Sequence, residues 1–120
     1  MTIQRLLDKV NEEVPNTFTE EKLISFVNEV ESDVSEQLCV DFETEYTVDD
    51  METELLAPAP YDRLYVSYLK AMIDYSNQEY ASYSNNVAQH TQDFRDFVDW
   101  VIRTGRATES VFPNKIINIM

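Results

Sequence analysis

Apolar side chains recur every three or four residues through most of this chain, which is the spacing of amphipathic helices. Thr2 is a suitable N-cap for the first such stretch, and Thr17-Phe18-Thr19-Glu20 offers Thr17 or Thr19 as the cap of the second. The periodicity predicts four helices, at about residues 2–14, 18–38, 60–82 and 86–104. Several acids lie opposite the apolar face of the second helix and are expected to be solvated: Glu29, Glu31, Asp33 and Glu36.

Residues 61–104 contain neither proline nor glycine, between the breaker Pro58-Ala59-Pro60 and Gly105, the single glycine of the chain. One helix over this span would be about 65 Å long, too long for a compact domain of this size. The segment Ser82-Tyr83-Ser84-Asn85-Asn86 separates two apolar stripes, and its Ser and Asn side chains compete for backbone hydrogen bonds. We therefore expect a break there, as a kink or a hairpin turn, and an unbroken helix only within an assembly.

Six of the seven tyrosines lie between residues 61 and 83, at positions that share one broad helix face. A stripe of core residues is one interpretation of this face. Tyrosine keeps a polar tip, however, and is favoured at protein–protein contacts, so the other interpretation is a subunit interface. Glu79 lies on the same face and, if buried, needs tyrosine hydroxyls or a cation as partner. The predicted interface residues are Tyr61, Tyr65, Tyr68, Glu79 and Tyr83.

The composition is typical of a helical protein. With 120 residues, 43% apolar content and one glycine, the chain is long enough for one modest core and poor in the residues that a turn-rich fold needs. We predict an all-α fold: a small bundle of about four helices over residues 1–104, with a long central helix or a helical hairpin, followed by an extended docking tail over residues 105–120. An irregular connection is expected from Cys39 to Met51.

The net charge of −14 is unevenly distributed along the chain. Residues 1–56 carry sixteen acids and three bases, whereas residues 57–120 carry seven acids and six bases. An acidic half of this kind repels phosphate, so nucleic-acid binding by a basic patch is excluded. The charge serves either solubility alone or a surface that DNA passes without adhering.

The motifs of known enzyme and metal sites are missing from the sequence. One glycine does not make a phosphate-binding loop, one histidine (His90) does not make a two-histidine metal site, and Cys39 has no partner for an internal disulfide. The acids Asp49, Asp50, Glu52 and Glu54 lack the spacing and turn glycine of an EF-hand. No apolar run reaches the length of a membrane span. We expect no catalysis, no cofactor, no resident metal and no membrane insertion.

The end of the sequence is densely apolar. Such side chains at a terminus need burial. They either fold back on the core of their own chain or dock into a neighbouring protein. The candidate docking residues are Phe112, Ile116, Ile117, Ile119 and Met120.

The segment from about residue 55 to residue 106 resembles the central and distal helices of the head-to-tail connector proteins of tailed bacteriophages, also called adaptor or head-completion proteins. The resemblance covers about half of the chain and is a pattern of helix faces and turns. The matching positions are Pro58, Pro60, Tyr61, Asp62, Leu64, Tyr65, Tyr68, Leu69, Ile73, Asp74, Asn77, Glu79, Tyr83, Asn85, Asn86, Phe94, Phe97 and Trp100.

The resemblance implies a structural virion protein that forms a ring on the portal and joins the DNA-filled head to the tail. Its partners would be other copies of itself, the portal protein and a tail-proximal connector or stopper protein. It would be found in the host cytoplasm during assembly and then in the virion neck. The apolar tail would anchor the subunit on the portal, and the tyrosine face would meet the acidic connection or second helix of the next subunit. The alternative is an acidic helical regulator, such as a DNA mimic, that binds a basic partner.

Overall fold

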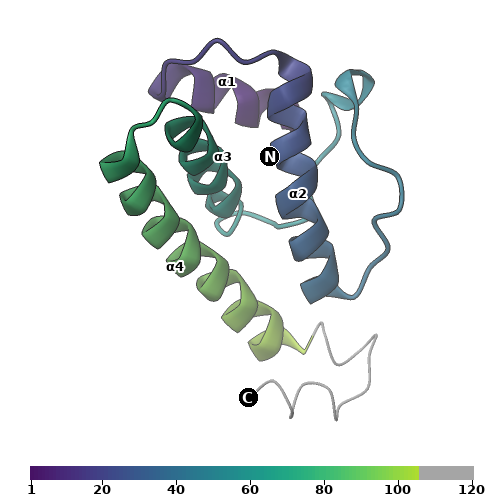
Figure 1. Ribbon diagram of the computed structural model, residues 1–120. Coiled ribbons are helices and arrows are strands. Elements are labelled where there is room, and N and C mark those ends of the chain that lie inside the picture. The colour runs from purple at the N-terminus through teal and green to yellow at the C-terminus, as the bar shows by residue number, and fades with distance from the viewer. Residues whose placement is uncertain (106–120) are drawn as a thin grey trace.

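The computed structural model describes residues 1–105, and the predicted tail at 106–120 lies outside the described residues. The described part contains α1 (Ile3–Glu13), α2 (Glu20–Leu38), the 3-10 helix η1 (Val48–Asp50), α3 (Arg63–Ser76) and α4 (Tyr80–Thr104), and no strand (Figure 1). The prediction of a small all-α bundle of four helices is therefore confirmed.

Local side-chain chemistry sets several of the helix ends. The hydroxyl of Thr2 accepts a hydrogen bond from the Arg5 amide at 3.2 Å, and that of Thr19 accepts one from the Lys22 amide, also at 3.2 Å. Thr19 is thus the N-cap of α2, one of the two residues considered from the sequence. Gly105 ends α4 with φ 72°, a left-handed conformation that glycine adopts without a steric cost.

The predicted break at Ser82–Asn86 is wrong, because these residues lie inside α4. The chain reverses instead at residues 77–79, so the span from Pro60 to Gly105 is a helical hairpin. Gln78 takes the left-handed conformation with φ 61°, and the Glu79 amide donates to the Asp74 carbonyl at 2.9 Å. This hydrogen bond closes the end of α3, and the chain reverses direction immediately after it.

Asn86 explains why the Ser/Asn segment stays helical. Its side-chain amide donates to the Asp74 carboxylate across the hairpin at 2.6 Å. The amide is therefore engaged in a tertiary contact, and it does not compete for the backbone hydrogen bonds of its own helix.

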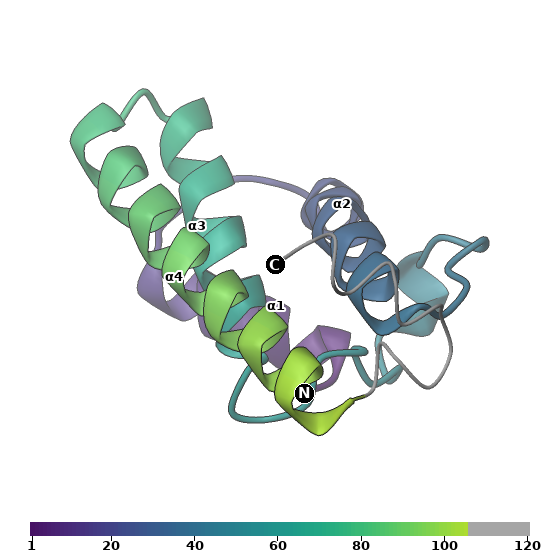
Figure 2. The ribbon, with the colours of Figure 1, turned by 90° about the horizontal axis from the view of Figure 1, so that it is seen from below.

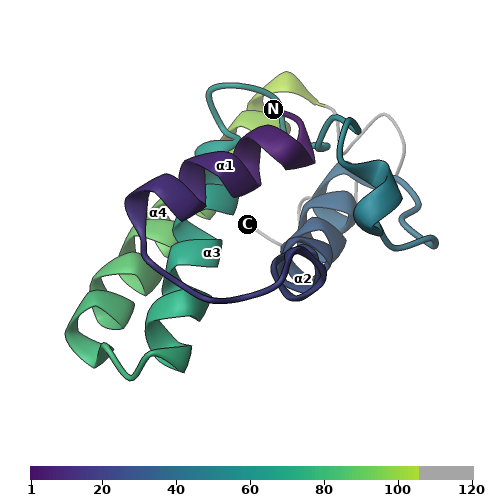
Figure 3. The ribbon, with the colours of Figure 1, turned by 90° about the horizontal axis from the view of Figure 1, so that it is seen from above.

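The four helices are arranged around the hairpin. Figure 2 shows α3 and α4 side by side with α2 standing apart from them, and Figure 3 shows α1 lying across the same pair. The core lies where the apolar faces of all four helices meet, with Tyr65 and Phe97 its largest fully buried side chains. Other fully or nearly fully buried members are Ile3, Leu6, Leu7, Val10, Leu23, Val27, Val30, Val34, Leu64, Leu69, Ile73 and Val101.

The connection between α2 and α3 is irregular except for η1, as predicted, and runs along the side of α2 that faces away from α4 (Figure 1). It is nevertheless tied to the helices. Asn28 of α2 bonds both backbone groups of Tyr46, at 3.1 and 2.8 Å. Further on, the Leu55 amide donates to the Met1 carbonyl at 2.9 Å, and the Ile3 amide donates to the Thr53 carbonyl at 3.1 Å. The N-terminus and the connection therefore hold each other in place.

Candidate interaction surfaces

Glu31 is the most unusual charged residue of the structure, because its side chain has no exposed surface. Its carboxylate accepts hydrogen bonds from the hydroxyls of Tyr65 and Tyr46, the latter at 2.8 Å, and from the Leu56 amide at 3.0 Å. The expectation that Glu31 is solvated is wrong. A buried carboxylate is tolerated when several donors satisfy its oxygens, and here three do so.

The Glu31 network joins α2, α3 and the connection between them. Burial raises the pKa of both tyrosine hydroxyls, and the neighbouring Glu31 carboxylate raises them further. Both tyrosines therefore stay protonated and act as donors. The Tyr65 hydroxyl also accepts a bond from the Ala57 amide at 2.9 Å. The network thus fixes the packing of three segments against each other.

The residues predicted for a subunit interface do not form one surface. Tyr65 is fully buried and belongs to the core, so it is not available to a neighbouring subunit. Tyr61 is half-buried against Trp100, with ring centroids 5.3 Å apart. Tyr68 is half-buried and donates to the Glu29 carboxylate at 2.6 Å. The helix face inferred from the sequence is thus divided between the core and separate surface positions.

The remaining two residues of that prediction lie near the turn of the hairpin. Glu79 is exposed, so its carboxylate is solvated and needs no buried partner. Tyr83 is half-buried, and its ring lies 5.2 Å from that of Tyr75. Tyr75 also contacts Tyr80, with centroids 6.2 Å apart, and each of these two side chains is 57% exposed. Large apolar rings at this exposure are typical of contact surfaces, and we call Tyr75, Tyr80 and Tyr83 the tip cluster.

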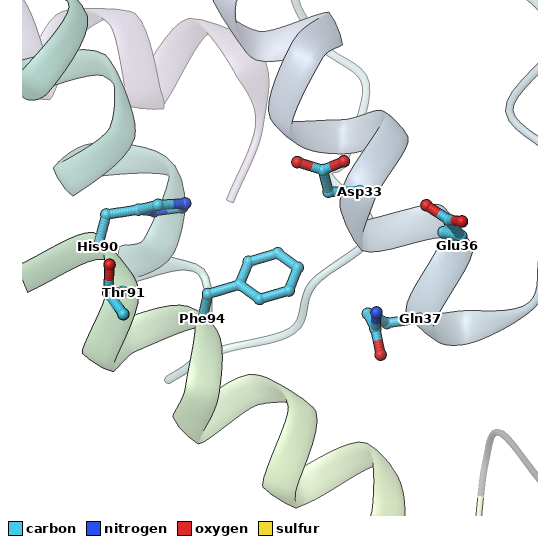
Figure 4. A pocket seen from close by; sticks show the side chains of 6 residues that line it. All are labelled: Asp33, Glu36, Gln37, His90, Thr91 and Phe94. Atoms are coloured by element: carbon cyan, nitrogen blue, oxygen red, sulfur yellow. The ribbon is translucent and has the colours of Figure 1, made fainter. Parts of the chain in front are cut away.

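A groove with a volume of about 340 Å³ lies between α2 and α4. Figure 4 shows His90 and Phe94 projecting from α4 toward α2, and Asp33 projecting from α2 toward them. Glu36 and Gln37 of α2 and Thr91 of α4 complete the lining. The groove therefore combines an aromatic ring on one wall with two carboxylates on the other.

The charges of the groove are set by partial burial. Burial raises the pKa of Asp33 above its ordinary value, and the negative charge of Glu36 raises it further, against a weaker effect of His90. Burial lowers the pKa of His90, although the Leu64 carbonyl, Asp93 and Asp33 oppose this effect. The Nδ1 atom of His90 lies 2.9 Å from the Leu64 carbonyl oxygen. Because a carbonyl oxygen only accepts, Nδ1 carries the proton of the neutral ring.

A second polar cluster holds the hairpin together. Asp93 of α4 is only 3% exposed and bonds Arg63 of α3 at 3.2 Å and the Ser67 hydroxyl at 3.0 Å. Arg63 also pairs with Asp96 at 2.9 Å. The hydrogen bonds from Gln92 and Arg63 lower the pKa of Asp96. All these groups are mutually satisfied, so the cluster stabilises the α3–α4 contact.

Two acids of the connection, Asp50 and Glu54, have structural partners. Asp50 accepts a bond from the Thr47 amide at 2.8 Å and closes the capping box of η1, and Glu54 pairs with the N-terminal amine at 2.9 Å.

Within residues 1–105, no three His, Cys, Asp or Glu side chains are grouped as metal ligands. In the same part of the chain, no helix combines the length and apolar character needed to cross a membrane. The predicted portal-anchor residues Phe112, Ile116, Ile117, Ile119 and Met120 lie outside the described residues.

The groove was not predicted from the sequence, and of the tip cluster only Tyr83 was among the predicted interface residues. Phe94 was one of the positions of the connector resemblance, and Asp33 was expected to be solvated. The pairing of α2 with α4 brings residues 33 and 94 together, and no local pattern encodes that pairing. Comparison with known proteins adds no relative: no family model, no curated protein and no solved structure matches the chain.

Proposed function

We propose that this chain is a structural subunit of the head-to-tail connector of a tailed bacteriophage, where it assembles as a ring on the portal. The observation that carries the proposal is that the segment with the connector resemblance folds as one helical hairpin with an exposed aromatic tip. Tyr75 and Tyr80 of this tip are each 57% exposed and contact each other. A subunit contact would bury these rings and gain free energy from the apolar surface removed from water.

The tip cluster and the groove supply the two different surfaces that a ring requires. Subunits in a closed ring contact each other head to tail, so each presents one surface to the preceding neighbour and another to the next. The tip cluster lies at the end of α3 and the start of α4, and His90 of the groove lies about 15 Å from Tyr80 along α4, at ~1.5 Å per residue. The half-buried Tyr61 and Tyr68 remain candidate contact residues, and the fully buried Tyr65 is removed from the set.

The charge distribution supports a role beside DNA. Of the sixteen acids among residues 1–56, those on the outer side of α2 and along the connection are exposed, including Glu29, Glu43 and Glu45. In a ring whose lumen carries such a surface, repulsion of the phosphate backbone lets DNA pass without adhering. The net charge of −14 also makes free subunits repel each other, so we expect the ring to form on the portal. The C-terminal residues Phe112 to Met120 would anchor it there, and the completed ring would occupy the virion neck next to a tail-proximal partner.

The test is electron microscopy of portal-bearing, tailless heads mixed with this protein. Three proteins are compared: the full chain, a chain ending at residue 110, and the full chain with Tyr80→Ser. We expect ring density on the portal with the full chain, none with the truncated chain, and sparse or incomplete rings with Tyr80→Ser. Heads that stay bare with the full chain would rule out the connector function.

A second candidate is an acidic regulator that binds a basic partner. It is favoured by the concentration of exposed acids on α2 and on the connection, a surface that is complementary to a DNA-binding protein. Salt separates the two functions: binding of a basic partner weakens steeply as salt increases, whereas assembly through apolar contacts persists. A pull-down from host extract at low and high salt therefore follows if the heads remain bare.

A further inference from the structure

We propose that residues 106–120 of the free chain bind in the groove between α2 and α4. The groove is built for a segment that is both apolar and basic. The Phe94 ring provides an apolar wall, while Asp33 and Glu36 stand on the opposite wall. Within residues 1–105, neither of these carboxylates forms a salt bridge with a cation.

The electrostatics of the groove favour a cation as the missing partner. Asp33 and Glu36 stand on the same wall, and partial burial together with the charge of Glu36 raises the pKa of Asp33. A positive charge placed between them would relieve both the repulsion and the loss of hydration. An aromatic face beside two carboxylates also suits the aliphatic stem and charged head of a lysine or arginine.

The composition of residues 106–120 matches this requirement. The segment contains two bases, Arg106 and Lys115, and one acid, Glu109, whereas residues 1–105 contain seven bases and twenty-two acids. The segment thus has a positive balance, in contrast to residues 1–105 taken together. It also carries six large apolar side chains: Val111, Phe112, Ile116, Ile117, Ile119 and Met120.

The covalent length of the segment suits a return along α4. Phe94 precedes Gly105 by eleven residues, which is about 16 Å of helix at ~1.5 Å per residue. Five extended residues cover that distance at ~3.3 Å each. Residues 106–110 are therefore enough to bring Val111 and Phe112 to the level of Phe94, and Lys115 then lies within reach of Asp33 and Glu36.

The proposal concerns the isolated chain and holds independently of the connector function. One consequence rests on that function, namely that the groove and the portal would compete for the same apolar residues. The free subunit would then keep its anchor covered until it meets the portal.

Zero-length crosslinking of the full chain with a carbodiimide tests the proposal, because this reagent joins an amine to a carboxylate only when the two are in contact. We expect Lys115 linked to Asp33 or Glu36 in the monomer band, identified by peptide mass spectrometry. The Lys9–Glu13 pair, 3.2 Å apart, is the internal positive control. The Lys9–Glu13 product without any product that links Lys115 to α2 would overturn the proposal. Products found only in a dimer band would also overturn it, because the occupant would then come from a second copy.

Substitution on the apolar wall tests the other half of the proposal. Phe94→Ala is expected to lower the yield of the Lys115 crosslink about tenfold, since burying an aromatic side chain contributes enough free energy for such a change. Val87→Ala is the matched control, because Val87 is an exposed apolar residue of α4 outside the groove lining. Equal yields in the two variants would contradict the assignment of Phe94.

A second variant keeps the test valid if Phe94→Ala disturbs folding. The exposed pair Asp33→Asn and Glu36→Gln removes both charges with little change of shape. We expect faster amide hydrogen exchange in residues 111–117 of this variant than in the unsubstituted chain at the same pH. Unchanged exchange would show that the carboxylates do not hold the segment.

Discussion

At the residue scale, Glu31 determines how three segments pack. It lies on α2, and its carboxylate binds donors from α3 and from the connection at residues 46 and 56. Apolar packing alone would allow these segments to slide against each other. A buried acceptor with three aimed donors permits one arrangement, because any other leaves a charge or a donor unpaired.

We predict that Glu31→Ala lowers the free energy of unfolding by about 3–5 kcal/mol, since it removes a fully buried acceptor that three donors share. Glu29→Ala is the matched control on the same helix, because Glu29 is exposed and binds only the Tyr68 hydroxyl among the described side chains. For the control we expect a loss below about 1 kcal/mol. Urea titration of both variants measures the difference, and equal losses would contradict the role of Glu31.

His90 gives the protein a predictable response to acid. Its surroundings are the Leu64 carbonyl and Tyr68 on α3, Asp93 and Phe94 on α4, and Asp33 on α2. Burial lowers its pKa, so on acidification the unfolded chain takes up the proton first. The contribution of His90 to stability is therefore present above pH ~6.5, and it is lost as the pH falls from there through the pKa of the folded state.

We predict that acidification from pH ~7.5 to ~5.5 destabilises the unsubstituted protein more than it destabilises His90→Gln. Chemical denaturation of both proteins across this range gives the comparison, with the values at pH ~7.5 as baseline. The raised pKa of Asp33 acts in the opposite direction. A smaller acid effect in the unsubstituted protein would mean that the carboxylates around His90 stabilise its charged form.

At the scale of elements, the α3–α4 hairpin depends on a three-residue turn. Gln78 at its centre has φ 61°, a conformation that costs a residue with a Cβ atom roughly 1 kcal/mol. The turn persists because the two helices pack along a shared apolar face and are joined by the bonds of Asp93 and Asn86. Packing between the helices therefore outweighs the local preference of the turn.

Gln78→Gly should raise the free energy of unfolding by about 1 kcal/mol, because glycine adopts this backbone conformation without strain. The matched control is Ala88→Gly, at an exposed position inside α4, which should lower stability by a similar amount. Thermal unfolding followed by circular dichroism measures both effects. A loss of stability with Gln78→Gly would contradict the conformation assigned to the turn.

At the scale of the whole molecule, the excess of negative charge opposes the compact state. The net charge is −14. The ion pairs of the described residues lie on α1, α3 and α4 and join the N-terminal amine to Glu54 and Asp62, whereas most acids of the connection take part in none. Repulsion among the unpaired acids acts over distances that salt screens, whereas the buried Glu31 network is shielded from solvent.

Raising NaCl from ~0.01 M to ~0.15 M shortens the screening length from about 30 Å to about 8 Å, and we expect the melting temperature to rise by a few degrees. Neutralising two exposed acids of the connection, with Glu43→Gln and Glu45→Gln, should raise the melting temperature at low salt. The same substitutions should reduce the rise of the melting temperature that added salt causes. Scanning calorimetry at both salt concentrations provides the measurement. A melting temperature that falls with salt would show that ion pairs outweigh the repulsion.

The sequence by itself determined the helices, because the signals that begin, continue and end a helix are local. Apolar residues at helical spacing and Thr2, Thr19 and Gly105 at the ends act within a few residues of each other, and the structure confirms a small all-α bundle. The sequence also placed the irregular connection correctly, since poor helix formers and clustered acids deny it a regular pattern.

Only the tertiary structure decided which side chains are buried, where the hairpin turns and where the groove lies. Glu31 and Tyr65 are 34 residues apart, and their bond depends on how α2 meets α3. Whether a residue at the edge of an apolar face is solvated or buried depends on which side chains of the neighbouring helix pack against it. The Ser/Asn segment stayed helical for the same reason, since Asn86 found its partner across the hairpin. Contacts between distant elements depend on three-dimensional packing, and periodicity along the chain does not encode them.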